Sequence, residues 1–331
     1  MQDDKLLSIL ADLAWHPGEQ LAGHFQLSRT AIWKRIAYLR EQGLTIEADR
    51  GKGYRLRDPV QWFSLEKLSA SLQPSVRECL RFDIEKTIDS TNRACLRLIE
   101  QAGQSPTHGY VQLAEQQTGG KGRRGRRWTS PPGCNIYVSL VWRFEGGASS
   151  LSGLSLAVGL AIVTALERQG YAGLQLKWPN DILWQGRKLA GILLEMSGDV
   201  AGACDVVIGF GVNVAMPKAV DKEIDQPWVD LAEIAPNLVP DKNKILAGIL
   251  NELFDVLQAF KLQGFTHLRE RWEAYDAYNS ASVRLTIGAD GQAGAQLEGI
   301  YRGVNTDGSI TLEIGGELRQ FSGGELSLRK I

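Results

Sequence analysis

Ten residues near the middle of the chain combine dense positive charge with glycines. The stretch GGKGRRGRRW, residues 119–128, holds five Lys or Arg side chains and no acidic residue. It contains G-x-G-x-x-G, the pattern of a dinucleotide-binding loop. Such a loop opens a helix, but here Pro131 and Pro132 follow too closely for a long helix to begin. It also lacks the Gly-Lys-Ser/Thr of a P-loop, and Arg127 replaces the Val of a kinase loop. Three interpretations of this stretch remain: a loop that contacts nucleic acid, a site for another anion, and a solvated run of charge.

Cations, hydroxyl and amide groups, and glycines recur in four other short stretches: DSTN (89–92), KWPND (177–181), GRKLAG (186–191) and GFGVN (209–213). Taken alone, DSTN would be read as a plain helix N-cap. The glycines of GFGVN allow a ligand to approach the backbone closely. Because ligand sites in α/β proteins form where strands end, the four stretches and the basic loop together predict one binding site.

After its first 62 residues the chain divides into two regions that differ in the spacing of their apolar residues. Within 63–275, apolar runs alternate between strands and helices, which predicts a mixed-sheet α/β (α+β) domain. The expected strands lie within 110–115, 135–142, 174–179, 192–197 and 206–215, and the long helices within 151–170 and 242–260. Residues 276–331 change to short alternating strands between Gly-rich turns, which predicts a C-terminal SH3-like β-barrel.

Residues 1–62 predict a winged helix-turn-helix. A first helix is indicated by apolar residues at helical spacing, a second is short, and Ser28 is a good N-cap for a third. The apolar residues that define these helices are Leu6, Ile9, Leu10, Leu13, Leu21, Ala22, Phe25, Ile32, Ile36 and Leu39. A hairpin around the GKG turn at 51–53 follows as the wing.

The third helix and the wing are predicted to bind DNA. Residues 28–57 carry eight Lys or Arg against three acids. In this fold the third helix enters the major groove, and bases in the wing reach phosphates. The predicted DNA-binding residues are Ser28, Arg29, Thr30, Trp33, Lys34, Arg35 and Lys52. The alternative is a three-helix bundle that contacts other proteins and leaves a solvated basic face.

Composition limits the class of protein. The 331 residues carry a net charge of −1, which excludes a basic coat for nucleic acid. The four cysteines are too far apart for a metal knuckle, so reduced thiols are expected and no metal ligands are predicted. The sequence MQDDKLL has acids where a signal peptide has bases, and we expect no apolar run of about 20 residues. A cytoplasmic protein is therefore expected.

The motifs in this order and spacing resemble the bifunctional biotin protein ligases, which are also biotin operon repressors. The resemblance runs nearly end to end. It is carried by LSRTAIWKRI, RGKGYRL, DSTN, AEQQTGGKGRRGRRWTSPPGCNIYVSL, KWPNDI, GRKLAGILLE and IGFGVNV. It implies an enzyme that makes biotinoyl-5′-AMP from biotin and ATP and transfers biotin to a lysine of a biotin carboxyl carrier protein.

The resemblance also implies roles for individual residues. Hydroxyl and amide groups would face the ureido ring of biotin, and cations would meet its carboxylate and the phosphate of ATP. The implied catalytic residues are Lys188, Arg123, Lys177 and Asp181. The implied ligand-binding residues are Ser90, Thr91, Asn92, Gln117, Gly120, Lys121, Gly122, Arg123, Arg124, Trp128, Lys188, Gly209, Gly211, Asn213 and Trp228. One departure is Lys121, where the family loop often has Arg, so the planar fork of a guanidinium is lost.

The resemblance further implies Mg²⁺ accompanying ATP, a basic loop that orders over the ligand, and a second closing loop around Trp228. It implies that the protein charged with biotinoyl-AMP, the corepressor, forms a homodimer that binds operator DNA. Acceptor and second subunit would compete for one surface. Two alternatives are a DNA-binding regulator with an inactive catalytic domain and a lipoate-type ligase. The intact Lys188, Arg123 and KWPND argue against the first, and the complete GKGRRGR loop argues against the second.

Overall fold

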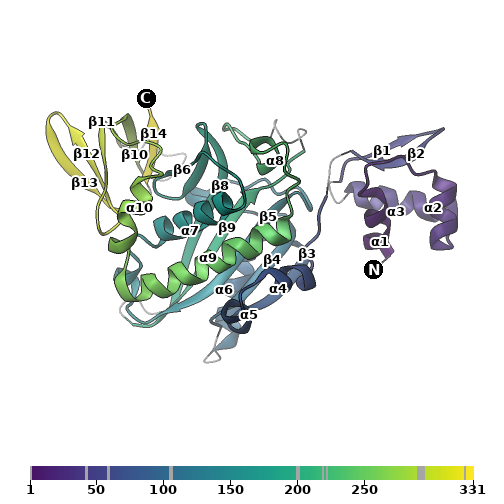
Figure 1. Cartoon of the computed structure of the whole chain (residues 1–331), viewed down its shortest axis with the longest axis horizontal. Coiled ribbons are helices and arrows are strands. Elements are labelled where there is room, and N and C mark those ends of the chain that lie inside the picture. The colour runs from purple at the N-terminus through teal and green to yellow at the C-terminus, as the bar shows by residue number, and fades with distance from the viewer. Residues whose placement is uncertain are drawn as a thin grey trace.

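The computed structural model describes residues 2–41, 44–57, 60–103, 107–198, 202–217, 220, 223–288, 295–323 and 326–331. It confirms the predicted architecture: an N-terminal winged helix, a central mixed sheet with helices, and a C-terminal antiparallel sheet. In Figure 1 the N-terminal unit lies to the right of the central sheet, and the C-terminal strands lie at its opposite end.

The N-terminal unit has three helices followed by a two-stranded hairpin. Its elements are α1 (Gln2–Leu10), α2 (Gly18–Phe25), α3 (Arg29–Glu41), β1 (Ile46–Asp49) and β2 (Gly53–Leu56). The hydroxyl of Ser28 accepts the backbone N–H of Ala31 at 3.1 Å, so Ser28 caps α3 as predicted. Leu13 departs from the expected stripe: it lies beyond α1 at φ +61° and is 37% exposed.

The central domain is built on a seven-stranded sheet in the order β3-β4-β5-β9-β8-β7-β6, in which β3 and β4 are parallel and the other neighbours antiparallel. Its strands are β3 (Arg81–Ile88), β4 (Tyr110–Gln117), β5 (Asn135–Phe144), β6 (Leu174–Lys177), β7 (Asp181–Trp184), β8 (Arg187–Gly198) and β9 (Cys204–Asn213). Its helices are α4 (Leu65–Ser71), α5 (Pro74–Cys79), α6 (Thr91–Ala102), α7 (Leu154–Arg168), α8 (Leu231–Ile234), α9 (Lys242–Gln263) and α10 (Arg269–Glu273).

Helices cover both faces of this sheet. The helix pair α7 and α9 packs on one face and supplies much of the main core (Figure 1). Helix α6 packs on β4, β5 and β9, where Cys95, Val141 and Val207 form a separate buried cluster. Contrary to expectation, the stretch Ala148–Arg168 is long and apolar enough to cross a membrane, but most of it is buried inside the domain. Its composition is that of a core helix enclosed on all sides.

The chain between the winged helix and the central domain is fastened by a buried ion pair. Glu115 on β4 binds Lys242, the first residue of α9, and both side chains are at most 4% exposed. A second oxygen of Glu115 accepts the N–H of Phe63 at 2.5 Å, and the ammonium group of Lys242 lies 4.0 Å from the Phe63 ring. Asn243 accepts the N–H of Ser64 at 2.8 Å. The linker therefore docks on the sheet and on the start of α9.

The C-terminal strands form a five-stranded antiparallel sheet in the order β13-β12-β11-β10-β14. They are β10 (Ser282–Ile287), β11 (Ala295–Val304), β12 (Ile310–Ile314), β13 (Glu317–Phe321) and β14 (Leu326–Lys330). The indole N–H of Trp178, which is 2% exposed, donates to the carbonyl of Gly308 at 3.0 Å. The residues before β10 pair with β6 through the backbone. The N–H of Leu176 donates to the carbonyl of Tyr275, and the carbonyl of Leu176 accepts the N–H of Ala277. The C-terminal sheet thus docks beside KWPND.

Candidate active site

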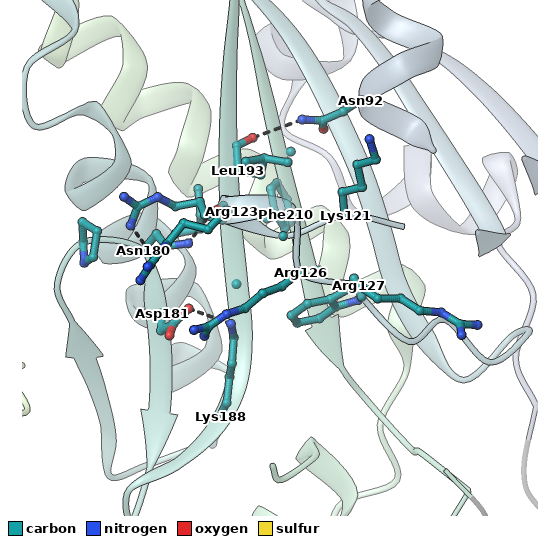
Figure 2. Close-up of a pocket in the computed structure, with 18 of the residues that line it drawn as sticks. Asn92, Lys121, Arg123, Arg126, Arg127, Asn180, Asp181, Lys188, Leu193 and Phe210 are labelled. Carbon is teal, nitrogen blue, oxygen red and sulfur yellow. Dashed lines mark hydrogen bonds and ion pairs between the residues drawn. The ribbon is translucent and has the colours of Figure 1, made fainter. Parts of the chain in front are cut away.

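One cleft collects residues from all five predicted stretches. It is partly open to solvent and lies beneath the basic loop 119–128. Figure 2 shows Asn92 at one end, Asp181 and Lys188 at the other, and the cations of the loop between them. The predicted site residues that line it are Ser90, Thr91, Asn92, Gln117, Lys121, Gly122, Arg123, Arg124, Trp128, Lys177, Asp181, Lys188, Gly209 and Gly211.

The Asn92 end is polar and enclosed. Ser90 precedes the first residue of α6 but its side chain makes no cap hydrogen bond, so the reading of DSTN as a plain N-cap does not account for this hydroxyl. Ser90, Thr91 and Asn92 are 4–6% exposed. Gln117, at the end of β4, accepts the backbone N–H of Thr91 at 2.9 Å. Hydroxyl and amide groups held in this way suit a ligand that both donates and accepts hydrogen bonds.

The opposite end is ionic. Asp181 binds Lys188 at 2.7 Å and Lys177 at 3.5 Å, and the three side chains are 14–20% exposed. The three residues meet because β7 pairs with β6 on one side and β8 on the other. Burial alone would raise the pKa of Asp181, but the two ammonium groups outweigh it and lower that pKa. Burial lowers the pKa of Lys177, and Asp181 opposes the change.

The basic loop joins the two ends. After a short turn at Arg123–Gly125 the chain folds back, with Arg124 at φ +60° and the N–H of Gly122 donating to Arg126 at 2.7 Å. The guanidinium of Arg123 donates to Asn180 at 3.2 Å. Burial lowers the pKa of Arg123, and the charge of Asp181 opposes that change. The turn of the loop is not followed by a long helix, which agrees with the rejection of a dinucleotide loop.

Trp128 forms a wall between the loop and the strands. The ammonium group of Lys188 lies 5.3 Å from its ring centroid. A Cβ added at Gly211 would lie 2.7 Å from this ring, and one at Gly209 would lie 1.9 Å from the side-chain oxygen of Asn92. These distances are below any normal contact, so GFGVN needs its glycines to leave room for protein side chains.

Three predicted residues lie outside the cleft lining. Asn213 is 5% exposed and donates to the carbonyls of Lys188 and Val229. It lines a smaller neighbouring hollow together with Trp228, whose chain pairs with Lys188 through an isolated bridge. Gly120 accepts the N–H of Trp128 at 2.9 Å. Each contacts a residue of the cleft: Asn213 through its side-chain amide, and Gly120 and Trp228 through the backbone.

Sequence reasoning missed several lining residues: Arg126, Arg127, Val138, Trp178, Pro179, Asn180, Gly191, Ile192, Leu193, Phe210, Gln226, Leu326, Ser327 and Leu328. Most adjoin the predicted motifs, so the motif positions could have found them. Leu326, Ser327 and Leu328 come from β14 of the barrel. No sequence signal connects them with residues more than a hundred positions earlier.

Most of the predicted DNA-binding residues are exposed on the winged helix. Ser28, Arg29, Thr30, Trp33, Lys34 and Lys52 are exposed, and Arg35 is half-buried. Trp33 is 55% exposed and lines a hollow with Arg29, Thr30 and Arg50 between α3 and the hairpin. Arg55 and Lys52 lie over the ring of Trp15, at 4.8 and 5.7 Å from its centroid. Arg55 also pairs with Glu47 at 2.7 Å, and Glu19 and Asp49 line the same hollow, so the surface carries both signs of charge.

The fold and the cleft together define a ligase domain joined to a helix-turn-helix domain. Residues 84–213 match the Biotin/lipoate A/B protein ligase family, and residues 4–55 match the HTH domain family. The chain belongs to the bifunctional biotin ligase/repressor family, since it is 37% identical over 325 residues to the bifunctional ligase/repressor BirA of Escherichia coli strain K12. That alignment covers 98% of this chain and 96% of the relative.

Two further similarities agree with this assignment. The bifunctional ligase/repressor BirA of Bacillus subtilis strain 168 is 28% identical over 318 residues, covering 94% of this chain and 93% of the relative. The structure of the biotin protein ligase from Aquifex aeolicus in complex with biotin and ATP superposes with a TM-score of 0.64 at 28% identity. It covers 76% of this chain and 99% of that protein.

Proposed function

We propose that this protein activates biotin with ATP to biotinoyl-5′-AMP and then transfers biotin to a lysine of a biotin carboxyl carrier protein. The observation that best supports this reaction is a cleft that is polar and enclosed at one end and cationic at the other. Membership of the ligase/repressor family supports the same reaction. The ureido ring occupies the end formed by Ser90, Thr91, Asn92 and Gln117, and its N–H and carbonyl groups match those side chains.

In the first step a carboxylate oxygen of biotin attacks the α-phosphorus of ATP, the Pα–O bond to the β-phosphate breaks, and pyrophosphate leaves. Both reactants are anions, so cations must neutralise the charge that develops on the phosphate. Lys188 and Arg123 perform this role, and Asp181 holds Lys188 in place. In the second step the acceptor amine attacks the acyl carbon, AMP leaves, and the nitrogen gives up a proton.

Mg²⁺ accompanies ATP. Asp181 is the one carboxylate among the described residues that line the cleft, and both its oxygens face ammonium groups. This donor set fits an ion held mainly by phosphate oxygens, with Asp181 as a single protein ligand at most. When bound, the ion would neutralise phosphate charge.

The basic loop 119–128 is proposed to close over biotin and the adenylate, with the segment around Trp228 as a second closing loop. Protection of the loop from proteolysis should increase when biotin and ATP are added. Equal cleavage rates with and without the ligands would contradict this closure.

Biotin-dependent exchange of pyrophosphate into ATP tests the activation step. Lys188→Ala should slow the exchange by about 10²–10³-fold, the usual cost of removing one preorganised charge. Lys67→Ala, which removes an exposed lysine of α4, is the matched control and should leave the rate unchanged. No exchange with biotin in the wild type would refute the ligase function. Exchange with lipoate instead would support the lipoate-type alternative.

The winged helix is proposed to repress transcription. Biotinoyl-5′-AMP acts as the corepressor by favouring a homodimer that binds a palindromic operator. The acceptor protein and a second subunit compete for one surface. The exposed cations around α3 and the hairpin support DNA binding. Biotin and ATP together should tighten binding to the operator, and equal affinity with and without them would contradict the regulatory role.

The division of labour follows the proposed boundaries. Residues 1–62 bind DNA, residues 63–275 bind biotin and ATP, and residues 276–331 form the C-terminal domain. We place both activities in the cytoplasm, where ATP, carrier protein and DNA meet. Separate expression of residues 1–62, followed by a measurement of cooperative unfolding by circular dichroism, tests the first boundary, and a fragment that does not fold would contradict it.

A further inference from the structure

A chain of hydrogen bonds runs behind the polar end of the cleft. The amide nitrogen of Asn92 donates to Glu195 on β8 at 2.7 Å and to the carbonyl of Leu193 at 3.3 Å (Figure 2 shows the bond to Leu193). Ser139 on β5 lies 2.5 Å from the amide oxygen of Asn92 and 2.8 Å from the hydroxyl of Thr91. Neither Ser139 nor Glu195 lines the cleft.

The direction of each hydrogen bond in this chain is fixed by chemistry. An ionised carboxylate only accepts, so Glu195 sets which atom of the Asn92 amide is nitrogen. Both amide hydrogens are then used, and the amide oxygen must accept. Ser139 has one hydroxyl hydrogen, and at 2.5 Å from an obligate acceptor it donates that hydrogen to Asn92.

The hydroxyl of Thr91 consequently has its hydrogen committed to the protein. The oxygen of Ser139 lies 2.8 Å away and can only accept, because its own hydrogen is already donated. The other neighbour is the carbonyl oxygen of Gln117 at 3.2 Å, which also only accepts. Whichever neighbour takes the hydrogen, Thr91 presents lone pairs to the cleft that it lines.

We propose that Glu195 and Ser139 are positioning residues that fix Thr91 as a hydrogen-bond acceptor, so that the cleft selects a ligand with an N–H donor at this point. The ureido ring of biotin has such a donor, and this inference rests on the proposed function. A dithiolane ring has none, so the same chain rejects lipoate-like ligands. Selection of this kind is strong because a mismatched ligand leaves buried polar groups unpaired.

The test compares the dissociation constants of biotin and of biotin methylated on one or the other ureido nitrogen, measured by calorimetry. The wild type should prefer biotin to at least one methylated form. Ser139→Ala removes the nearer acceptor, at 2.8 Å, and leaves only the Gln117 carbonyl at 3.2 Å, so the Thr91 hydrogen is free to turn toward the ligand. Biotin should then bind roughly tenfold more weakly while that methylated form changes little, because only biotin has the N–H at this point. The steric cost of the methyl group is common to both proteins and cancels in the comparison. Equal weakening of both ligands, or of neither, would overturn the proposal.

A paired exchange separates polarity from packing. Asn92→Asp places two carboxylates against each other and should abolish the preference. Adding Glu195→Gln restores a donor at 195 and an acceptor at 92, and most of the preference should return. A double variant no better than Asn92→Asp would also overturn the proposal. Thr107→Val, which removes a buried hydroxyl bonded to Asp205 at 3.2 Å, is the folding control and should bind both ligands normally. A wild type that binds no biotin would refute the proposed function instead.

Discussion

The ion pair between Glu115 and Lys242 makes a large and testable contribution to stability. Lys242→Met leaves the Glu115 carboxylate buried with the N–H of Phe63 as its remaining described partner. Removing one member of a buried pair costs about 3–5 kcal/mol. Urea unfolding, followed by tryptophan fluorescence, should show a loss of this size at pH 8.

The same loss should depend on pH. Burial raises the pKa of Glu115 even with Lys242 present, and without that cation the pKa rises further. The folded variant then keeps a proton that the unfolded chain releases above its pKa of about 4.3. Between the Glu115 pKa of the folded wild type and the higher pKa of the folded variant, the deficit in the free energy of unfolding grows by up to about 1.4 kcal/mol per pH unit as pH rises. The variant should therefore lie closer to the wild type at pH 5 than at pH 8.

Two further variants control this prediction. Glu115→Gln added to Lys242→Met removes the buried charge and should recover much of the loss. Lys244→Met changes an exposed lysine in the same turn of α9 and should shift the free energy of unfolding by less than about 0.5 kcal/mol. A deficit independent of pH, together with no recovery from Glu115→Gln, would refute the reasoning.

Three other predictions concern the cleft and the barrel. Gly209→Ala should weaken biotin binding at least roughly tenfold in calorimetry, because its methyl group displaces Asn92; unchanged affinity would contradict this. Trp178→Phe leaves the buried carbonyl of Gly308 without its donor and should lower the free energy of unfolding by about 1–3 kcal/mol in urea; a loss near zero would show that the docking is not needed. Burial raises the pKa of Asp276 from 3.8 to about 6. Its stabilising contribution is therefore complete below 3.8 and is lost as pH rises through 6. Asp276→Asn should reduce the fall in the free energy of unfolding between pH 3.8 and about 6. An unchanged slope would contradict this role of Asp276.

Much of the fold follows from local patterns. The strand around Tyr137, the helix around Ala161 and the turn at Gly308 lie where periodicity and turn residues predict them. Pro131 and Pro132 were enough to reject a dinucleotide loop. These features depend on neighbours in sequence, which a single chain displays directly.

The rest of the site depends on the order of strands in the sheet, which periodicity does not contain. Helix α6 packs across β5, and this packing brings Asn92 to Ser139 although 47 positions separate them in the chain. The pairing of Glu115 with Lys242 likewise joins residues 127 positions apart. A buried glutamate inside a strand and a lysine at a helix start each look ordinary in sequence. Only the packed structure identifies them as partners.

The span of the cleft along the chain bears on how the protein is made. Its wall runs from Ser90 to Leu328, so every shorter nascent fragment lacks part of it. During synthesis the winged helix emerges first, and the strand that completes the cleft emerges more than 200 residues later. A ligand can therefore stabilise the complete cleft only after the barrel has left the ribosome. Cleavage of the chain between Trp178 and β14 would remove part of the cleft wall even if every loop residue stayed in place.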